Sequence, residues 1–215
     1  MQNEKFFDYW QNMYSQENRF GTGPTKLAES AIEILSEIQR IKILEIGCGQ
    51  GRDALFFSEK NFRIDAFDIS PNAISFINKI KHEEKLENLN VFVHDATKPL
   101  KPDTEYNFAY SNLALQFFDL NNLEKVFENV ANVLKEESQF LLSTKKKGDK
   151  YYQFGKKISE NAFENKGVIR YFFEKEELQK ILENRFEIIN FDADKHVNLD
   201  STVSEWWKVL VKKKS

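Results

Sequence analysis

Three alternate glycines directly follow a short, mainly apolar run, and this junction limits the possible folds more than any other stretch. The run 41–46 has the pattern of a buried parallel strand, and Gly47, Gly49 and Gly51 come straight after it. Glycines let the backbone turn tightly and approach a ligand closely, while the helix that begins beyond them offers unpaired N–H groups. The junction therefore predicts a strand, a nucleotide-binding turn and a helix in succession.

Strand-like and helix-like segments alternate along the rest of the chain. Expected strands cover 63–67, 89–93, 106–110, 139–143, 186–192 and about 204–211. Expected helices cover 5–17, Pro24 to about Gln39, 121–135 and 174–184. A further helix is expected to begin with Ser70 as its N-cap and Pro71 at its first position. This alternation predicts a mostly parallel sheet with helices on both faces, and ligands then bind beyond the carboxyl ends of the strands.

The length of 215 residues favours one domain, 1–215. We divide it into an N-terminal helical segment 1–40, a cofactor-binding core 41–143, a polar insertion or flap 144–170, and a C-terminal helix and strands 171–215. The first segment is rich in aromatic residues. It is either a lid over the ligand or an ordinary amphipathic helix. The aromatic residues that would cover the ligand in the first case are Tyr9, Trp10, Tyr14 and Phe20.

The amino-acid composition limits the binding partners and the cellular compartment that we expect for the protein. The net charge of −3 does not indicate a nucleic-acid-binding face. Cys48 is the single cysteine, so no intrachain disulfide can form. The first residues do not resemble a signal peptide, and no apolar run approaches the ~20 residues of a membrane span. We therefore expect a cytoplasmic protein, a monomer or homodimer, with no nucleic-acid or membrane partner.

The glycine loop by itself is compatible with more than one nucleotide cofactor. A dinucleotide loop needs Gly-x-Gly-x-x-Gly. Counted from Gly47 the sixth residue is Arg52, and counted from Gly49 it is Ala54, a tolerated variant that places the first glycine far beyond the strand. A Walker phosphate loop needs Gly-Lys-Ser or Gly-Lys-Thr, which is missing here. A dehydrogenase thus remains an alternative.

An acid at the end of the second expected strand supports a ribose. Asp68 follows the loop by about the 20 residues typical of a ribose-binding carboxylate. Asp65 is the competing acid, but it falls in the middle of the strand, and a helix-capping role for Asp68 is the other alternative. If Asp68 faces the ligand, Asp68→Ala should weaken cofactor binding with little loss of fold.

The pattern Glu45-x-Gly47-x-Gly49-x-Gly51, followed by the stretch 68–74, resembles the class I S-adenosylmethionine-dependent methyltransferases. The similarity covers about 41–143, and the terminal parts resemble the small-molecule branch that includes thiopurine and tellurite-resistance methyltransferases. It implies a Rossmann-like α/β fold: a seven-stranded, mostly parallel sheet with helices on both faces and the last strand antiparallel. The implied cofactor is S-adenosylmethionine, with S-adenosylhomocysteine as product, and no metal is implied.

The resemblance also implies where the cofactor binds. Asp95 would contact the adenine amino group, the Ala96 backbone would contact the ring, and Ser111 and Asn112 would lie near the sulfonium. The full expected cofactor set is Glu45, Gly47, Cys48, Gly49, Gly51, Asp68, Ile69, Asp95, Ala96, Ser111 and Asn112.

The sequence offers no obvious general base. Many relatives carry a histidine near the position of Gln116, and this chain does not; catalytic candidates are Asn112, Tyr14 and His94. We therefore expect in-line methyl transfer to a soft or readily ionised small molecule, in a pocket whose candidate residues are Tyr151, Tyr152, His196 and Trp206. The alternatives are a non-catalytic cofactor-binding or regulatory protein and a protein or RNA methyltransferase.

Overall fold

A computed structural model gives the structure of the protein and describes residues 2–16, 21–36, 41–101 and 105–215. The helices are α1 (Gln2–Met13), α2 (Lys26–Leu35), α3 (Arg52–Glu59), α4 (Pro71–Glu84), the 3₁₀ turn η1 (Leu115–Phe117), α5 (Leu120–Val133) and α6 (Lys175–Leu182). The strands are β1 (Lys42–Ile46), β2 (Arg63–Asp68), β3 (Leu89–Val93), β4 (Tyr106–Asn112), β5 (Leu134–Lys145), β6 (Lys156–Ser159), β7 (Ala162–Asn165), β8 (Val168–Tyr171), β9 (Phe186–Val197) and β10 (Val203–Lys213).

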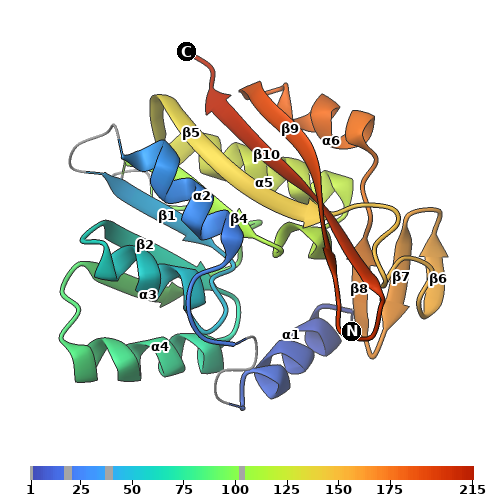
Figure 1. Ribbon diagram of the computed structural model, residues 1–215, viewed down its shortest axis with the longest axis horizontal. Coiled ribbons are helices and arrows are strands. Elements are labelled where there is room, and N and C mark those ends of the chain that lie inside the picture. Colours follow the sequence, from blue (N-terminus) through green and yellow to red (C-terminus); the bar gives the residue numbers. More distant parts are fainter. Residues whose placement is uncertain (1, 17–20, 37–40, 102–104) are drawn as a thin grey trace.

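A seven-stranded sheet in the order β3-β2-β1-β4-β5-β10-β9 forms the centre of the molecule (Figure 1). Strands β3, β2, β1, β4 and β5 pair in parallel, whereas β10 is antiparallel to both of its neighbours. One buried cluster joins α2, α3 and α4 to the sheet, and a second joins α5 and α6 to it. The predicted Rossmann-like fold, with helices on both faces and the last strand antiparallel, is confirmed.

The two halves of the sheet differ in strand length. Strands β1 to β4 have 5, 6, 5 and 7 residues, whereas β5, β9 and β10 have 12, 12 and 11. The long strands continue beyond the short ones toward α1 and the smaller sheet (Figure 1). The sequence prediction for these three strands was too short because most of their added residues are polar and do not form an apolar run.

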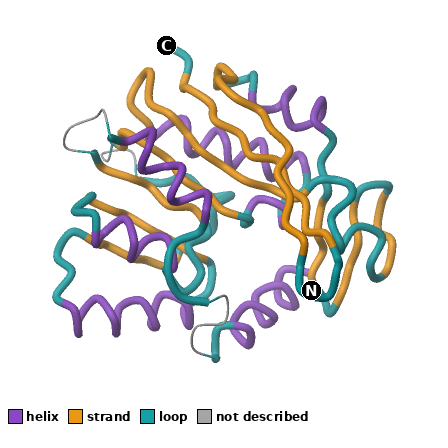
Figure 2. Tube along the Cα trace, in the orientation of Figure 1, coloured by secondary structure: helices purple, strands orange, loops and turns teal. Residues whose placement is uncertain are grey.

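The insertion 144–170 contains a separate three-stranded antiparallel sheet, β6-β7-β8, where the sequence predicted only a polar flap (Figure 2). Its small core holds Phe163 and Phe172, with the Tyr152 ring edge-on to both. These strands carry little signal in the sequence because each has four residues, and all four of β6 are exposed.

Capping residues fix two of the helix starts. Ser70 caps α4, accepting from the Ala73 N–H, with Pro71 at the first helical position as predicted. Thr25 caps α2, so the prediction that Pro24 begins the helix was wrong. Phe20 and the expected end of this helix near Gln39 lie outside the described residues. Within the described part of the chain, no helix is long and apolar enough to span a membrane.

Candidate cofactor and acceptor site

A cavity of about 1170 Å³ lies beyond the carboxyl ends of β1 to β4, between α1 and the long strands. This is the point where the strand order reverses, the usual ligand position in such sheets. Nine of the expected cofactor residues line it: Glu45, Gly47, Cys48, Gly49, Asp68, Ile69, Asp95, Ala96 and Asn112. The catalytic candidates Tyr14 and His94 line it too, whereas Gly51 and Ser111 are not among the lining residues.

Neighbouring groups explain why the loop after β1 needs glycine. Gly47 has φ +70°, and a Cβ there would overlap the methyl group of Ala114. A Cβ on Gly49 would come 2.8 Å from the Tyr14 hydroxyl oxygen. Gly51 instead faces the Ile77 side chain of α4, where a Cβ would come 2.8 Å from Ile77 Cγ1, so its contact is with the core. The loop thus has one surface on the cavity and one on α4.

Asp68 connects the end of β2 to the glycine loop. Its carboxylate accepts from the Gly49 N–H at 3.0 Å and from the Ser70 N–H at 2.9 Å. The residue is only 8% exposed, and burial raises the pKa of Asp68 while the backbone N–H groups oppose the rise. Asp65, the competing acid, lies away from the cavity, where it pairs with Lys42 at 2.7 Å and accepts from the Tyr106 hydroxyl.

Two further acids are buried beside the loop. Glu45 is 4% exposed, and its Oε2 has no hydrogen-bond partner among the described residues. Burial, followed by the nearby charges of Asp53 and Asp68, raises the pKa of Glu45 well above its ordinary value. Asp53 accepts from the backbone and hydroxyl of Thr25 and from the Tyr110 hydroxyl. The sequence analysis missed this Asp53 network because its members come from three separate elements.

The loop after β3 places its polar groups in local contacts. Asp95 Oδ1 accepts from the Thr97 N–H at 2.9 Å and from its hydroxyl at 2.8 Å. The Nε2 of His94 lies 3.2 Å from the Lys98 carbonyl oxygen, and the His94 ring is edge-on to Phe67. His94 therefore borders the cavity with a ring nitrogen already engaged by the backbone.

The end of β4 separates two expected site residues. Ser111 is fully buried and donates to the Ile46 carbonyl at 3.0 Å, joining β4 to β1. Asn112 faces the cavity, and its Oδ1 accepts from the Ser143 hydroxyl at 2.7 Å. Gln116, which also lines the cavity, donates to the Leu113 carbonyl, while its Oε1 is buried without a partner among the described residues.

Helix α1 covers one side of the cavity with aromatic rings. Trp10 stacks on Tyr14 at a centroid distance of 5.4 Å and is edge-on to Phe117 at 5.0 Å. Burial, together with the nearby Asp68 and Cys48, raises the pKa of Tyr14 well above its ordinary value. The helix is anchored by Gln11, whose Oε1 accepts from the Ser70 hydroxyl at 2.5 Å and from the Asn72 N–H at 3.0 Å.

The wall opposite the glycine loop comes from β5, β8, β9 and β10. Tyr151, His196 and Trp206, three of the acceptor-pocket candidates, line it, whereas Tyr152 lies in the core of the small sheet instead. Lys145 and Arg170 also line this wall, and the sequence analysis missed both because no local motif distinguishes them.

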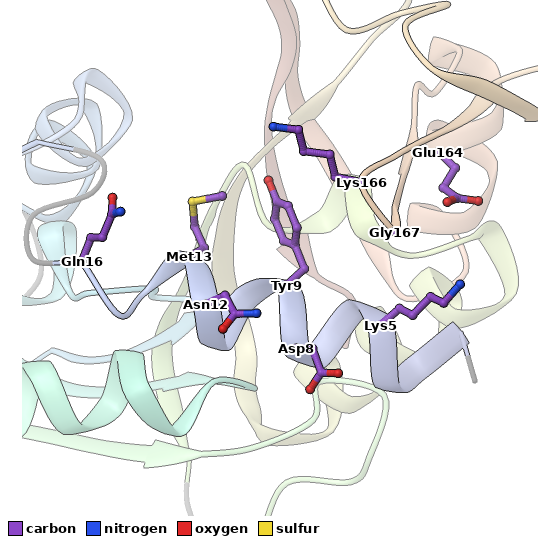
Figure 3. A pocket seen from close by; sticks show the side chains of 9 residues that line it. All are labelled: Lys5, Asp8, Tyr9, Asn12, Met13, Gln16, Glu164, Lys166 and Gly167. Carbon is purple, nitrogen blue, oxygen red and sulfur yellow. The ribbon is translucent and has the colours of Figure 1, made fainter.

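A second cavity of about 590 Å³ lies between α1 and the turn that joins β7 to β8 (Figure 3). Tyr9 and Met13 contribute to both cavities, and their side chains rise from one face of α1 while that of Asp8 points away. Its lining mixes Lys5, Lys166, Asp8 and Glu164, so no single charge dominates it.

Known proteins resemble the chain in sequence and in fold. A "Probable S-adenosyl-L-methionine-dependent methyltransferase TehB" of Haemophilus influenzae (strain 10810) is 24% identical over 123 residues, which are 57% of this chain and 40% of that protein. The chain thus spans about two fifths of that relative's length. A SAM-dependent methyltransferase from Methanosarcina mazei aligns with TM-score 0.72 and 22% identity, covering 85% of this chain and 97% of that one. TehB from H. influenzae aligns with TM-score 0.69 and 18% identity, covering 97% and 67%.

A family model extends the similarity over most of the sequence. The model described as "Tellurite resistance protein TehB" matches residues 7–196, from within α1 to the last residue but one of β9. The match includes the glycine loop, Asp68, the three-stranded insertion and most of the opposite wall. The chain therefore belongs to the TehB tellurite resistance protein family.

Proposed function

We propose that the chain binds S-adenosylmethionine in the large cavity and transfers its methyl group to a small-molecule acceptor, leaving S-adenosylhomocysteine. Family membership supports this class of reaction. The observation that carries the proposal is the convergence, at one switch point, of the glycine loop, the buried Asp68 and the unpartnered oxygen of Glu45.

The cavity fits the chemical parts of this cofactor. The unpartnered Glu45 Oε2 offers a hydrogen-bonding group to a cationic amino-acid end. Asp68, at the end of β2, suits ribose hydroxyls, and the loop at Asp95 and Ala96 suits the adenine. The bound cofactor supplies a methyl group already activated on a positively charged sulfur.

The chain contributes orientation and exclusion of water. The rings of Trp10, Tyr14 and Phe117 line the cavity and pack against one another, and this apolar wall would limit access of water to a bound cofactor. Aromatic faces also favour a nearby positive charge by roughly 0.5–2 kcal/mol. Holding an acceptor in line with the transferred group is worth about 7–11 kcal/mol in favourable systems.

Two of the three catalytic candidates do not suit the role of a general base. Asn112 does not titrate, and in His94, the third candidate, Nε2 is already engaged by the Lys98 carbonyl, which leaves Nδ1. The raised pKa of Tyr14 keeps its hydroxyl protonated at neutral pH. These observations favour an acceptor that reaches the site already ionised, or one soft enough to react without losing a proton first.

Titration calorimetry with S-adenosylhomocysteine and, separately, with NAD tests the cofactor. We expect binding of the first only, weakened in Asp68→Asn and unchanged in the matched control Asp65→Asn, whose carboxylate is outside the cavity. Binding of NAD instead would refute the assignment. Radiolabelled methyl transfer to thiols, amines, hydroxyls and cell extract then tests turnover. Cofactor binding without transfer to any of them would indicate a non-catalytic binding protein.

A further inference from the structure

Charge is unevenly distributed around the cavity. Three acids at the cofactor end, Glu45, Asp53 and Asp68, are buried, and a fourth, Asp95, is half-buried. Among the described residues of the opposite wall, four cations stand against a single acid, Asp194; the cations are Lys145, Arg170, Lys195 and Lys208. The end of the cavity away from the glycine loop therefore favours a negatively charged group.

Arg170 has no carboxylate partner among the described residues, in contrast to Lys145, Lys146 and Lys147. Neighbouring lysines are paired: Lys145 with Asp149, Lys146 with Glu205, and Lys147 with Glu174. Within the described chain, no ion pair or side-chain hydrogen bond involves the guanidinium of Arg170. An arginine that is partly buried without a carboxylate partner has unused hydrogen-bond donors.

Aromatic rings hold Arg170 in place. Its Cζ lies 5.6 Å from the centroid of Phe117 and 5.0 Å from that of Tyr151. All three side chains line the large cavity. Rings that pack on a guanidinium leave its N–H edge available, and that planar edge matches a carboxylate in a bidentate arrangement.

The neighbourhood of Lys145 adds a second reason for an anion. Burial lowers the pKa of Lys145, Asp149 opposes this, and the charge of Arg170 lowers it further. Lys145 and Arg170 both line this wall, and the one carboxylate paired with either is Asp149 on Lys145, so an excess positive charge remains. An anionic group on the ligand would offset that excess.

We propose that Arg170 determines acceptor specificity by binding a carboxylate of an organic acceptor, whose apolar body lies against Phe117 and Tyr151. The identity of this ligand as the acceptor rests on the proposed methyl transfer, whereas the carboxylate site itself does not. Phe117 and Tyr151 favour an organic acid over an inorganic anion because they offer apolar surface beside the single guanidinium.

Calorimetric titration with 3-phenylpropanoate, its neutral isostere 3-phenylpropanamide and inorganic phosphate tests this site, with and without saturating S-adenosylhomocysteine. In the wild type the carboxylate should bind about ten- to a hundredfold more tightly than the amide, the range expected for hydrogen bonds to a charged group. Arg170→Met should remove that preference, Arg170→Lys should restore part of it, and Lys157→Met on the exposed strand β6 should leave it unchanged.

Equal affinity for the carboxylate and the amide in the wild type would overturn the proposal, and this comparison needs no variant to fold. A preference that survives in folded Arg170→Met would overturn it as well. Phosphate binding more tightly than 3-phenylpropanoate would replace the organic acid with an inorganic anion. If S-adenosylhomocysteine fails to bind while the Arg170-dependent preference remains, the methyl-transfer proposal fails and the carboxylate site stands.

Discussion

Replacing Asp68 separates its structural role from its proposed role in cofactor binding. Asp68→Ala removes the acceptor of two buried N–H groups, those of Gly49 and Ser70. An orphaned buried donor costs about 1–3 kcal/mol, so the alanine variant should lose about 2–6 kcal/mol of unfolding free energy. That is a large share of the ~5–15 kcal/mol typical of a domain. The two hydrogen bonds therefore favour a larger loss of stability than the little loss of fold that the sequence led us to expect, because the carboxylate holds the loop as well as facing the cavity.

Asp68→Asn is the sharper perturbation. Its side-chain oxygen can still accept one of the two N–H bonds, so the loss should be about half that of alanine, or about 1–3 kcal/mol. Urea denaturation of the wild type, Asp68→Ala, Asp68→Asn and Asp65→Asn gives these free energies, and calorimetry with S-adenosylhomocysteine gives the affinities. An alanine variant as stable as the wild type would refute the hydrogen-bond accounting. An asparagine variant with wild-type affinity would refute the ribose assignment.

Three further predictions concern other parts of the site. The pKa of Glu45 is raised in the folded protein, so the folded protein keeps the Glu45 proton at pH values above 4.5, the ordinary pKa, where the unfolded chain loses it. The free energy of unfolding therefore falls as the pH rises through the raised pKa. Glu45→Gln should remove this fall in stability, so the variant should have a higher Tm than the wild type at alkaline pH. Curves of Tm against pH that run parallel for the two proteins would contradict this prediction. Ser111→Ala should cost about 0.5–1.5 kcal/mol in urea denaturation by losing its bond to Ile46, with unchanged S-adenosylhomocysteine affinity; weakened affinity would return Ser111 to the binding set. Gln11→Ala should speed hydrogen exchange in α1 by loosening its contacts with Ser70 and Asn72, while α5 keeps its protection as the control; unchanged exchange in α1 would show that its aromatic contacts suffice.

The central fold was predictable because its signals are local. Buried parallel strands appear as short apolar runs, and Ser70 with Pro71 marks a helix start without tertiary information. Strands β6 to β8 lacked such signals, since their pairing depends on a small core of Phe163, Phe172 and Tyr152 that forms only after folding.

The candidate site divides in the same way. The glycine loop and Asp68 follow strand ends, so sequence position alone indicates that they converge. Arg170 and Phe117 meet at the cavity only because the small sheet packs near η1, and no spacing in the sequence predicts that contact. For Ser111 the position on β4 could be predicted from the sequence. The direction of its hydroxyl group, which points to the Ile46 carbonyl and not into the cavity, could not.

The unequal lengths of the strands have an evolutionary consequence. The short strands that lead to the glycine loop and its neighbours contribute most of their side chains to the two buried clusters, where most substitutions cost stability. The overhanging ends of β9 and β10 are largely half-buried or exposed, so a substitution there should lower the free energy of unfolding only slightly. Such a substitution is tolerated even though natural proteins lie only just above the stability that function needs. We therefore expect homologues to differ more in the overhanging ends of β9 and β10 than around the glycine loop.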